Sequence, residues 1–191
     1  KMGHFHFQSG ELFVERVSAT NIAEQFDTPC YVYSKATFET NYNRFKAPWR
    51  DHPHRICYSV KANSNIAILN LLARLGAGFD IVSGGELARV LQAGGDVSSV
   101  VFSGVGKQAA EMQQALDANI HCFNVESSSE LELLNQLAGD AGKTANISVR
   151  INPDVDPLTH EYIATGLKEN KFGVNSDQVI EVYRRAAALA H

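Results

Sequence analysis

A lysine follows directly on a short apolar run, and this position in the chain is the one best suited to covalent chemistry. The run is Ile56-Cys57-Tyr58-Ser59-Val60, and Lys61 precedes the polar turn Ala62-Asn63-Ser64-Asn65. Side chains alternate between the two faces of a strand, so Lys61 shares its face with the small residues Cys57 and Ser59. A lysine in a confined space loses its proton more easily, and the free amine attacks carbonyl carbons. The stretch therefore predicts an amine nucleophile; the alternative is a lysine that ends a strand and faces water.

Two further charged residues lie within apolar strand-like segments. Asp80 stands in Phe79-Asp80-Ile81-Val82, where a buried carboxylate needs a cation or hydrogen-bond donors, and Lys61 is a plausible neighbour. The alternative for Asp80 is an edge position that faces water. Arg150 stands in Ser148-Val149-Arg150-Ile151-Asn152. A guanidinium near the end of a strand is suited to holding an anion, and the alternative is an ion pair with a neighbouring strand.

The elements that must position these residues alternate regularly. Each short apolar segment is followed by a polar turn and then by apolar residues at helical spacing. The expected strands cover residues 56–60, 79–82, 100–102, 120–125 and 147–151. Their starts are about 20 to 27 residues apart, which leaves room for the helical crossover that joins parallel strands. Two of the helix starts carry capping-box patterns, Ser83-x-x-Glu86 and Ser127-x-x-Glu130.

This alternation predicts an α/β fold with a parallel sheet, either doubly wound or closed as a (β/α)8 TIM-type barrel. A doubly wound nucleotide-binding fold carries a glycine fingerprint after its first strand. Here that turn, residues 61–64, has no glycine, which favours the barrel. In a barrel the chemistry lies at the carboxyl ends of the strands, where Lys61 stands. A complete barrel has eight units in about 250 residues, so we expect roughly the first five units of a longer protein.

The first part of the chain predicts a different arrangement. Leu12-Phe13-Val14 and the aromatic and β-branched segment 30–33 are expected to be strands, with a helical turn around 23–26. Ser34 is expected to cap a helix whose apolar stripe contains Phe38, Tyr42 and Phe45.

Composition excludes several classes of protein. The chain has 191 residues and a net charge of −4 without a basic tract, so neither nucleic-acid binding nor a membrane surface is indicated. No apolar run is long enough to span a bilayer. The three cysteines, Cys30, Cys57 and Cys122, form no C-x-x-C pair, which favours reduced thiols in a cytoplasmic protein.

Two other patterns in the sequence are weak signals. Gly104-Val105-Gly106-Lys107 resembles the end of a phosphate-binding loop, but Val101 replaces the first glycine and Gln108 the final hydroxyl residue. The histidine pairs at 4 and 6 and at 52 and 54 lie in polar flanks, without a set of carboxylate or cysteine partners at metal-ligand spacing. We expect no metal site.

Several stretches resemble a known family. Tyr58-Ser59-Val60-Lys61-Ala62-Asn63 and the segment from Gly78 to Glu86 are similar to the barrel-type pyridoxal-phosphate decarboxylases, which act on diaminopimelate, ornithine or arginine. Four other segments resemble the diaminopimelate branch of that family: residues 28–33, Arg150-Ile151-Asn152-Pro153, residues 159–166 including His160, and Asn170-Lys171-Phe172-Gly173.

The resemblance implies a role for each candidate residue. Lys61 would form a Schiff base with pyridoxal 5'-phosphate, Asp80 would lie close to it and help set its charge state, and Arg150 would line the cofactor pocket. It also implies an alanine-racemase-like barrel formed by residues 35–191, with residues 1–34 belonging to a second, β-rich domain. The implied reaction is decarboxylation of meso-2,6-diaminopimelate to L-lysine and CO2, in lysine biosynthesis, by a homodimer whose active sites are shared between subunits.

Three alternatives stay open at this point. One is a pyridoxal-phosphate decarboxylase of ornithine, arginine or carboxynorspermidine. Another is a relative that binds pyridoxal phosphate without catalysis, although a pure binding protein has no need of the Lys61 amine. The last is a cofactor-free aldolase that forms a Schiff base on the same fold.

Overall fold

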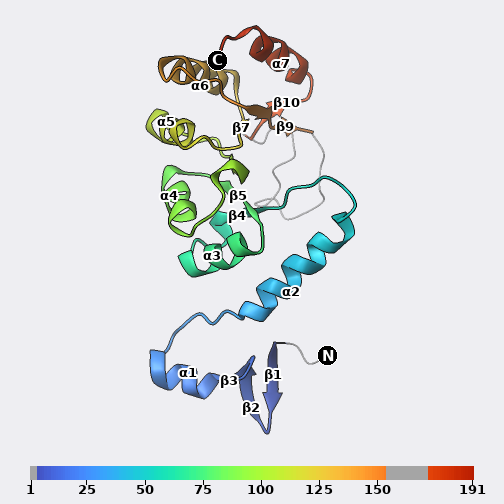
Figure 1. The fold of residues 1–191 in the computed structure, drawn as a ribbon, viewed down its shortest axis with the longest axis vertical. Helices are drawn as coiled ribbons and strands as arrows, with labels where there is room; N and C mark the ends of the chain where they lie inside the picture. The colour runs from blue at the N-terminus through green and yellow to red at the C-terminus, as the bar shows by residue number, and fades with distance from the viewer. Residues whose placement is uncertain (1–3, 154–171) are drawn as a thin grey trace. The chain divides into compact units, whose positions relative to one another are not determined.

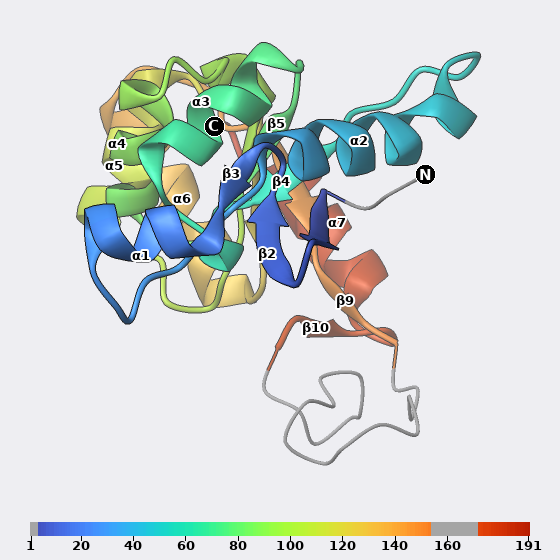
Figure 2. The ribbon, with the colours of Figure 1, turned by 90° about the horizontal axis from the view of Figure 1, so that it is seen from below.

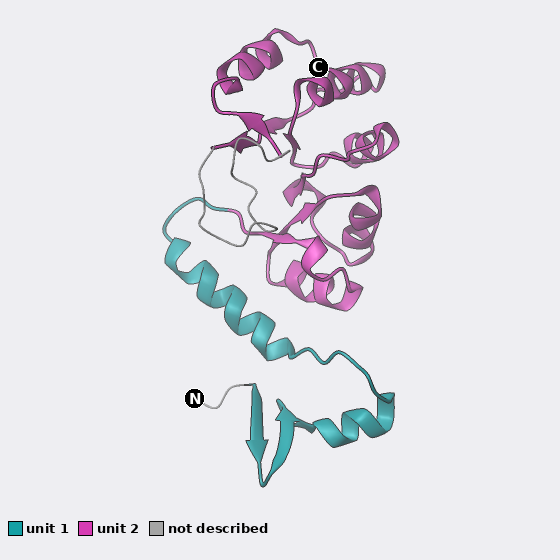
Figure 3. Ribbon diagram, turned by 180° about the vertical axis from the view of Figure 1, so that it is seen from behind, with its two compact units in different colours: residues 1–54 teal, residues 55–191 magenta. Residues whose placement is uncertain are grey.

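The computed structural model, drawn in Figure 1 and from below in Figure 2, describes residues 4–153 and 172–191. The chain forms two compact units, residues 1–54 and residues 55–191 (Figure 3). None of the helices in the described residues has the length and apolar character needed to span a membrane.

The first unit joins a small antiparallel sheet to two α-helices. Its elements are β1 (Phe5–Gln8), β2 (Glu11–Val14), β3 (Val17–Ser18), α1 (Ala19–Phe26), α2 (Lys35–Lys46) and the 3-10 turn η1 (Ala47–Trp49). Strand β2 pairs with both β1 and β3. The β1–β2 hairpin turns at Ser9 and Gly10, which have φ values of 52° and 83°. Positive φ at both loop residues gives the turn whose twist matches that of the paired strands.

The expected helix after Ser34 is confirmed, and the expected strand at 30–33 is wrong. The Ser34 hydroxyl oxygen accepts a hydrogen bond from the Thr37 amide at 3.0 Å and caps α2. Residues 30–33 form no regular secondary structure, and the Tyr31 side chain is 91% exposed. Strand propensity measures how well side chains pack on a sheet, and this segment packs on none within the described chain.

Glu15 ties the hairpin to the start of α2. Its Oε1 atom accepts hydrogen bonds from the Ser34 hydroxyl at 2.7 Å and from the Ala36 amide at 2.8 Å. These two bonds, that of the Ala36 amide first, lower the pKa of the Glu15 carboxyl below its ordinary value. A carboxylate at a helix N-terminus also interacts favourably with the helix dipole.

Replacing Glu15 with alanine is therefore expected to destabilise the start of α2 by about 1 kcal/mol, below the usual range for hydrogen bonds to a charged group because the site is exposed. Because the folded-state pKa is lowered, the contribution is present above the unfolded pKa and is lost as the pH falls through the folded pKa. Amide hydrogen exchange in α2 of the whole protein measures the change. Glu24→Ala, an exposed substitution on α1, is the control, and equal exchange in both variants would contradict the prediction.

Within residues 55–153 of the second unit, a five-stranded parallel sheet contains β4 (Cys57–Ser59), β5 (Gly78–Ile81), β6 (Val100–Phe102), β7 (Cys122–Val125) and β8 (Ile147–Val149), in that order. The α-helices of this unit are α3 (Ile66–Arg74), α4 (Gly84–Gln92), α5 (Ala109–Ala118), α6 (Ser128–Asp140) and α7 (Val179–Ala188). Shorter elements are the 3-10 turns η2 (Val60–Ala62) and η3 (Val97–Ser99) and the strands β9 (Ile151–Asn152) and β10 (Val174–Asn175).

The order of the strands confirms the expected barrel class. Neighbours in the sheet are neighbours in the chain, and Figure 1 shows α3 to α6 along one side of the strands. In a doubly wound sheet the strand order reverses and the helices cover both faces. A parallel sheet wound in one direction, with its helices on one face, is the arrangement of a (β/α) barrel wall.

The two faces of the sheet differ in polarity. On the face covered by the helices, alternate side chains of β5, β6 and β7 are fully or almost fully buried: Phe79, Ile81, Val100, Phe102, Phe123 and Val125. The register pairs Ser59 with Asp80 and Asn124 with Ser148, so these residues lie on the other face. That face, which lines the interior in a barrel, is therefore partly polar.

The structure differs from the expected strands at two places. Strand β4 stops at Ser59, and Lys61 lies in the one-turn helix η2. The expected strand at 147–151 is divided at Arg150, whose amide donates to the Val125 carbonyl while its own carbonyl accepts from the Val174 amide, both at 2.8 Å. The chain thus changes its pairing partner from β7 to β10 at Arg150, and β9 pairs in parallel with β10.

The two predicted capping boxes are partly confirmed. Ser83 and Ser127 each accept a hydrogen bond at 3.2 Å from the backbone amide three residues later. The side chains of Glu86 and Glu130 do not return to the capping serine. They accept instead from the amide of the residue before it, Val82 at 2.7 Å and Glu126 at 3.2 Å, respectively.

Candidate active site at the carboxyl ends of the strands

Lys61 lies at the carboxyl end of β4. The preceding residue, Val60, is fully buried and holds η2 against the core. Lys61 is exposed in this chain, so its surroundings among the described residues are those of the alternative, a lysine at a strand end, and not the expected confined space. Asn65 then caps α3 by accepting a hydrogen bond from the Ala67 amide at 2.9 Å. The local structure therefore presents the amine at the edge of the sheet where barrel enzymes have their active sites.

Asp80 lies in the middle of β5, between β4 and β6, and not at an edge of the sheet. It is half-buried, and the register places it beside Ser59. Its Oδ1 atom accepts a hydrogen bond of 2.5 Å from the Ser103 hydroxyl. The structure thus gives this carboxylate a hydrogen-bond donor, one of the two kinds of partner expected from the sequence, and the donor is Ser103.

Arg150 forms the ion pair that the sequence left open as an alternative. Its Nη1 atom lies 3.1 Å from both carboxylate oxygens of Glu126, which follows β7. The Glu126 side chain is only 1% exposed, and that of Arg150 is 41% exposed. The guanidinium carbon also lies 5.4 Å from the centre of the Phe172 ring, within the range of a cation–π contact.

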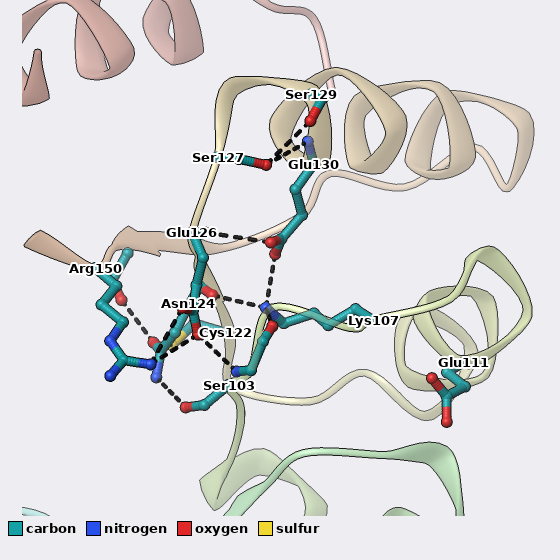
Figure 4. A network of polar contacts seen from close by, with 12 residues as sticks. Ser103, Lys107, Glu111, Cys122, Asn124, Glu126, Ser127, Ser129, Glu130 and Arg150 are labelled. Atoms are coloured by element: carbon teal, nitrogen blue, oxygen red, sulfur yellow. Dashed lines mark hydrogen bonds and ion pairs between the residues drawn. The ribbon is translucent and has the colours of Figure 1, made fainter. Parts of the chain in front are cut away.

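A second ion pair, Lys107 with Glu130, is buried nearby (Figure 4). The Lys107 side chain is 0% exposed, and its Nζ atom donates to the Gly104 carbonyl at 2.8 Å, the Asn124 carbonyl at 2.8 Å and Glu130 Oε1 at 2.7 Å. These three bonds use all the donors of an ammonium group. Lys107 is therefore a structural residue and not a phosphate-binding one.

Burial affects the ionisation of the glutamate in this pair. It raises the pKa of the Glu130 carboxyl above its ordinary value, although the hydrogen bond and the charge of Lys107 act in the other direction.

Sequence reasoning missed the ion pair between Lys107 and Glu130. The available signal was a lysine in the turn after one strand and a glutamate in the helix after the next.

Glutamates also fix the backbone of neighbouring loops at this edge. Glu111 of α5 accepts a hydrogen bond from the Gly84 amide, the first residue of α4, at 2.9 Å. Glu126 accepts one from the Gly104 amide, in the loop after β6, at 2.8 Å. In each case a glutamate of one βα unit holds an amide of the preceding unit.

The two cysteines of the parallel sheet are poorly suited to act as nucleophiles. All three are free, and Cys57 and Cys122 are half-buried within the sheet. Burial raises the pKa of both of these thiols above the ordinary value, which lowers the fraction of reactive thiolate. Within the described residues, no cluster of three or more His, Cys, Asp or Glu side chains could hold a metal ion.

The model of the family described as "Pyridoxal-dependent decarboxylase, pyridoxal binding domain" matches residues 35–191. The chain belongs to this family. Residues 1–34 lie outside the match.

Relatives with this sequence pattern include the diaminopimelate decarboxylases of Vibrio cholerae, 58% identical over 189 residues, and Pseudomonas aeruginosa, 56% identical over 190 residues. The alignments cover 98% and 100% of this chain but 45% and 46% of the relatives. The chain thus spans about half the length of the curated relatives it matches.

Solved structures agree with the fold. A diaminopimelate decarboxylase of M. jannaschii in complex with L-lysine superposes with a TM-score of 0.89 at 39% identity, covering 97% of this chain and 45% of that one. The Helicobacter pylori diaminopimelate decarboxylase complexed with L-lysine gives 0.83 at 44% identity, covering 89% and 44%. The motif at 159–166, His160 within it, and residues 170–171 lie outside the described residues.

Proposed function

We propose that the whole protein containing this chain is a pyridoxal-phosphate-dependent carboxy-lyase that converts meso-2,6-diaminopimelate to L-lysine and CO2. The observation that carries the proposal is the position of Lys61: an amine at the carboxyl end of a barrel strand, in a chain 58% identical to a diaminopimelate decarboxylase. Binding proteins do not need such an amine, and a carbonyl-bearing cofactor does.

The residues around Lys61 fit pyridoxal phosphate. The buried Oγ atom of Ser59, two residues earlier, has no hydrogen-bond partner among the described residues. A polar cofactor at this edge of the sheet would supply one, and the Lys61 amine would bind its aldehyde carbon. When bound, pyridoxal phosphate supplies a ring that takes up the electron pair left by the departing carboxylate.

The other candidate residues have supporting roles in this proposal. Asp80, on the strand next to β4, would lie close to the Lys61 amine that follows β4. Arg150, whose guanidinium is paired with Glu126, would line the cofactor pocket. A basic side chain at this position is also suited to balancing the negative charge of a phosphorylated cofactor or a dicarboxylate substrate.

The same proposal covers the organisation of the whole protein. Residues 35–191 would form the first part of the cofactor-binding barrel, and residues 1–34 would belong to a second, β-rich domain. The protein would act in the cytoplasm as a homodimer whose subunits share their active sites. The free thiols of all three cysteines are compatible with a reducing compartment.

An assay of the whole protein with pyridoxal phosphate tests the function. With meso-2,6-diaminopimelate we expect L-lysine and CO2 in equal amounts. We expect kcat/KM for ornithine, arginine and carboxynorspermidine to be lower by about 10⁴-fold, because a site built for a distal polar group rejects substrates that lack it. Faster CO2 release from any of these three, or pyridoxal-phosphate binding without CO2 release from any substrate, would contradict the proposal.

A further inference from the structure

A row of side-chain hydrogen bonds crosses the polar face of the sheet and ends at Asp80. The Ser148 hydroxyl on β8 lies 2.6 Å from Asn124 Oδ1 on β7. Asn124 Nδ2 lies 2.8 Å from the hydroxyl of Ser103, which follows β6. The Ser103 hydroxyl in turn lies 2.5 Å from Asp80 Oδ1 on β5. Four consecutive βα units therefore each contribute one polar side chain to the same row.

The donors and acceptors of this row can be arranged in only one direction. A carboxylate accepts hydrogen bonds, so Ser103 must donate its single proton to Asp80. Ser103 must then accept from Asn124, which requires the amide NH2 of Asn124 to face Ser103. The Asn124 carbonyl oxygen consequently faces Ser148, which donates to it. Every proton in the row points toward Asp80.

We propose that Ser103 and Asn124 are positioning residues that act through Asp80. The row holds the Asp80 carboxylate in one orientation beside Ser59, and Ser59 is two residues before Lys61. The carboxylate is therefore already oriented when the cofactor binds at this end of the strands. The inference rests on the proposed function, since it assigns to these residues the placement of a group that faces pyridoxal phosphate. Ser148 orients Asn124 and acts one step further away.

The alternative is that the row only satisfies polar groups inside the sheet. In that case its loss affects folding stability and leaves cofactor binding unchanged. Asn124→Asp separates the two cases, because the side chain keeps its shape but loses the NH2 donor. Asp80 and the new carboxylate at position 124 then compete for the single Ser103 proton, so the orientation of Asp80 is no longer fixed.

The test uses the whole protein, with the parent assayed first for decarboxylation of meso-2,6-diaminopimelate. The variants are Ser103→Ala, Ser103→Thr, Asn124→Asp and Ser148→Ala. The readouts are the dissociation constant of pyridoxal phosphate, measured by absorbance titration of cofactor-free protein, the pH profile of kcat, and the urea unfolding midpoint. Ser98→Ala is the matched control, because its hydroxyl donates to Asp96 near the amino end of β6.

Removing hydrogen-bond partners one step behind the groups that contact a metal costs about 10- to 100-fold in affinity or activity. We expect Ser103→Ala and Asn124→Asp to weaken pyridoxal-phosphate binding by about 10-fold, within that range, and to shift the pH profile of kcat. Ser103→Thr, which keeps the hydroxyl, should restore most of the affinity, and Ser148→Ala should have a smaller effect than Asn124→Asp.

Lower unfolding midpoints with unchanged cofactor affinity and pH profile in Ser103→Ala and Asn124→Asp would overturn the inference. The parent assay keeps the two proposals distinct. If the parent binds pyridoxal phosphate but does not decarboxylate diaminopimelate, the proposed function fails, while weakened binding in these variants still supports the positioning role. If the parent does not bind pyridoxal phosphate, both proposals fail.

Discussion

Replacing Lys61 with arginine in the whole protein is expected to lower kcat for decarboxylation by about 10³-fold or more, as for the loss of other covalent nucleophiles. Arginine keeps the positive charge and a long side chain, but its guanidinium stays protonated and cannot act as an amine nucleophile. The substitution therefore separates the covalent role of Lys61 from a simple electrostatic one. Because Lys61 is exposed in this chain, we expect little change in folding stability.

Borohydride reduction followed by peptide mass mapping measures the covalent role directly. In the parent protein loaded with pyridoxal phosphate, the reduced label should be found on the peptide containing Lys61, and it should be absent from Lys61→Arg. Lys143→Arg is the control. Lys143 lies before the amino end of β8, whereas Lys61 follows the carboxyl end of β4, and the Nζ atom of Lys143 donates to the Leu116 carbonyl. A label on a different lysine, or full activity of Lys61→Arg, would refute the assignment. Aldol cleavage by the parent protein in the absence of pyridoxal phosphate would favour the aldolase alternative.

Replacing Lys107 with methionine is expected to lower the free energy of unfolding by about 3–5 kcal/mol, the usual cost of removing one partner of a buried ion pair. Methionine keeps an unbranched, flexible side chain in the cavity but cannot donate to Glu130 or to the carbonyls of Gly104 and Asn124. Glu130 is then left buried without its cation.

The effect of Lys107→Met should depend on pH in a defined direction. Burial already raises the pKa of Glu130, and loss of Lys107 raises it further. A carboxyl whose folded pKa is raised binds its proton more tightly in the folded state, so stability falls as the pH rises through that pKa. We therefore expect the destabilisation to shrink as the pH is lowered from about 8 toward the unfolded pKa, near 4.3.

Urea unfolding of the whole protein at several pH values checks this prediction. The control is the double variant Lys107→Met with Glu130→Gln, which removes both charges. At neutral pH it should be more stable than Lys107→Met alone, because no ionised group remains buried without a partner. Equal stability of the single and double variants, or a destabilisation that does not change with pH, would show that the lost packing of Lys107 and not the charge of Glu130 is responsible.

Much of the fold of the second unit follows from local patterns in the sequence. Strand β6 has the expected bounds, 100–102, and the serines at 34, 83 and 127 cap the expected helices. Periodicity and capping are properties of neighbouring residues, so the sequence displays them directly. The strand expected at 30–33 failed because strand formation depends on a partner, and the break at Arg150 depends on Val174, which is 24 residues further along the chain.

In the candidate site, too, the sequence could indicate the residues themselves but not their distant partners. Lys61, Asp80 and Arg150 could be selected from residue type and from their place within or directly after apolar strand-like segments. Their partners could not, because Ser103 reaches Asp80 and Glu126 reaches Arg150 only through the register of the sheet. A serine or a glutamate after a strand is common, and the sequence does not show which strand lies beside it.

The glutamates that hold amides of the preceding βα unit have a consequence for how this scaffold can change. Barrel enzymes acquire new specificities through variation of single loops, because each loop is usually supported by its own strand and helix. Here Gly84 depends on Glu111, and Gly104 depends on Glu126. Replacing one βα unit, from the end of its strand through the first turn of its helix, therefore removes a support from the unit before it. Laboratory evolution at the carboxyl ends of these strands should succeed more often when adjacent units are exchanged together.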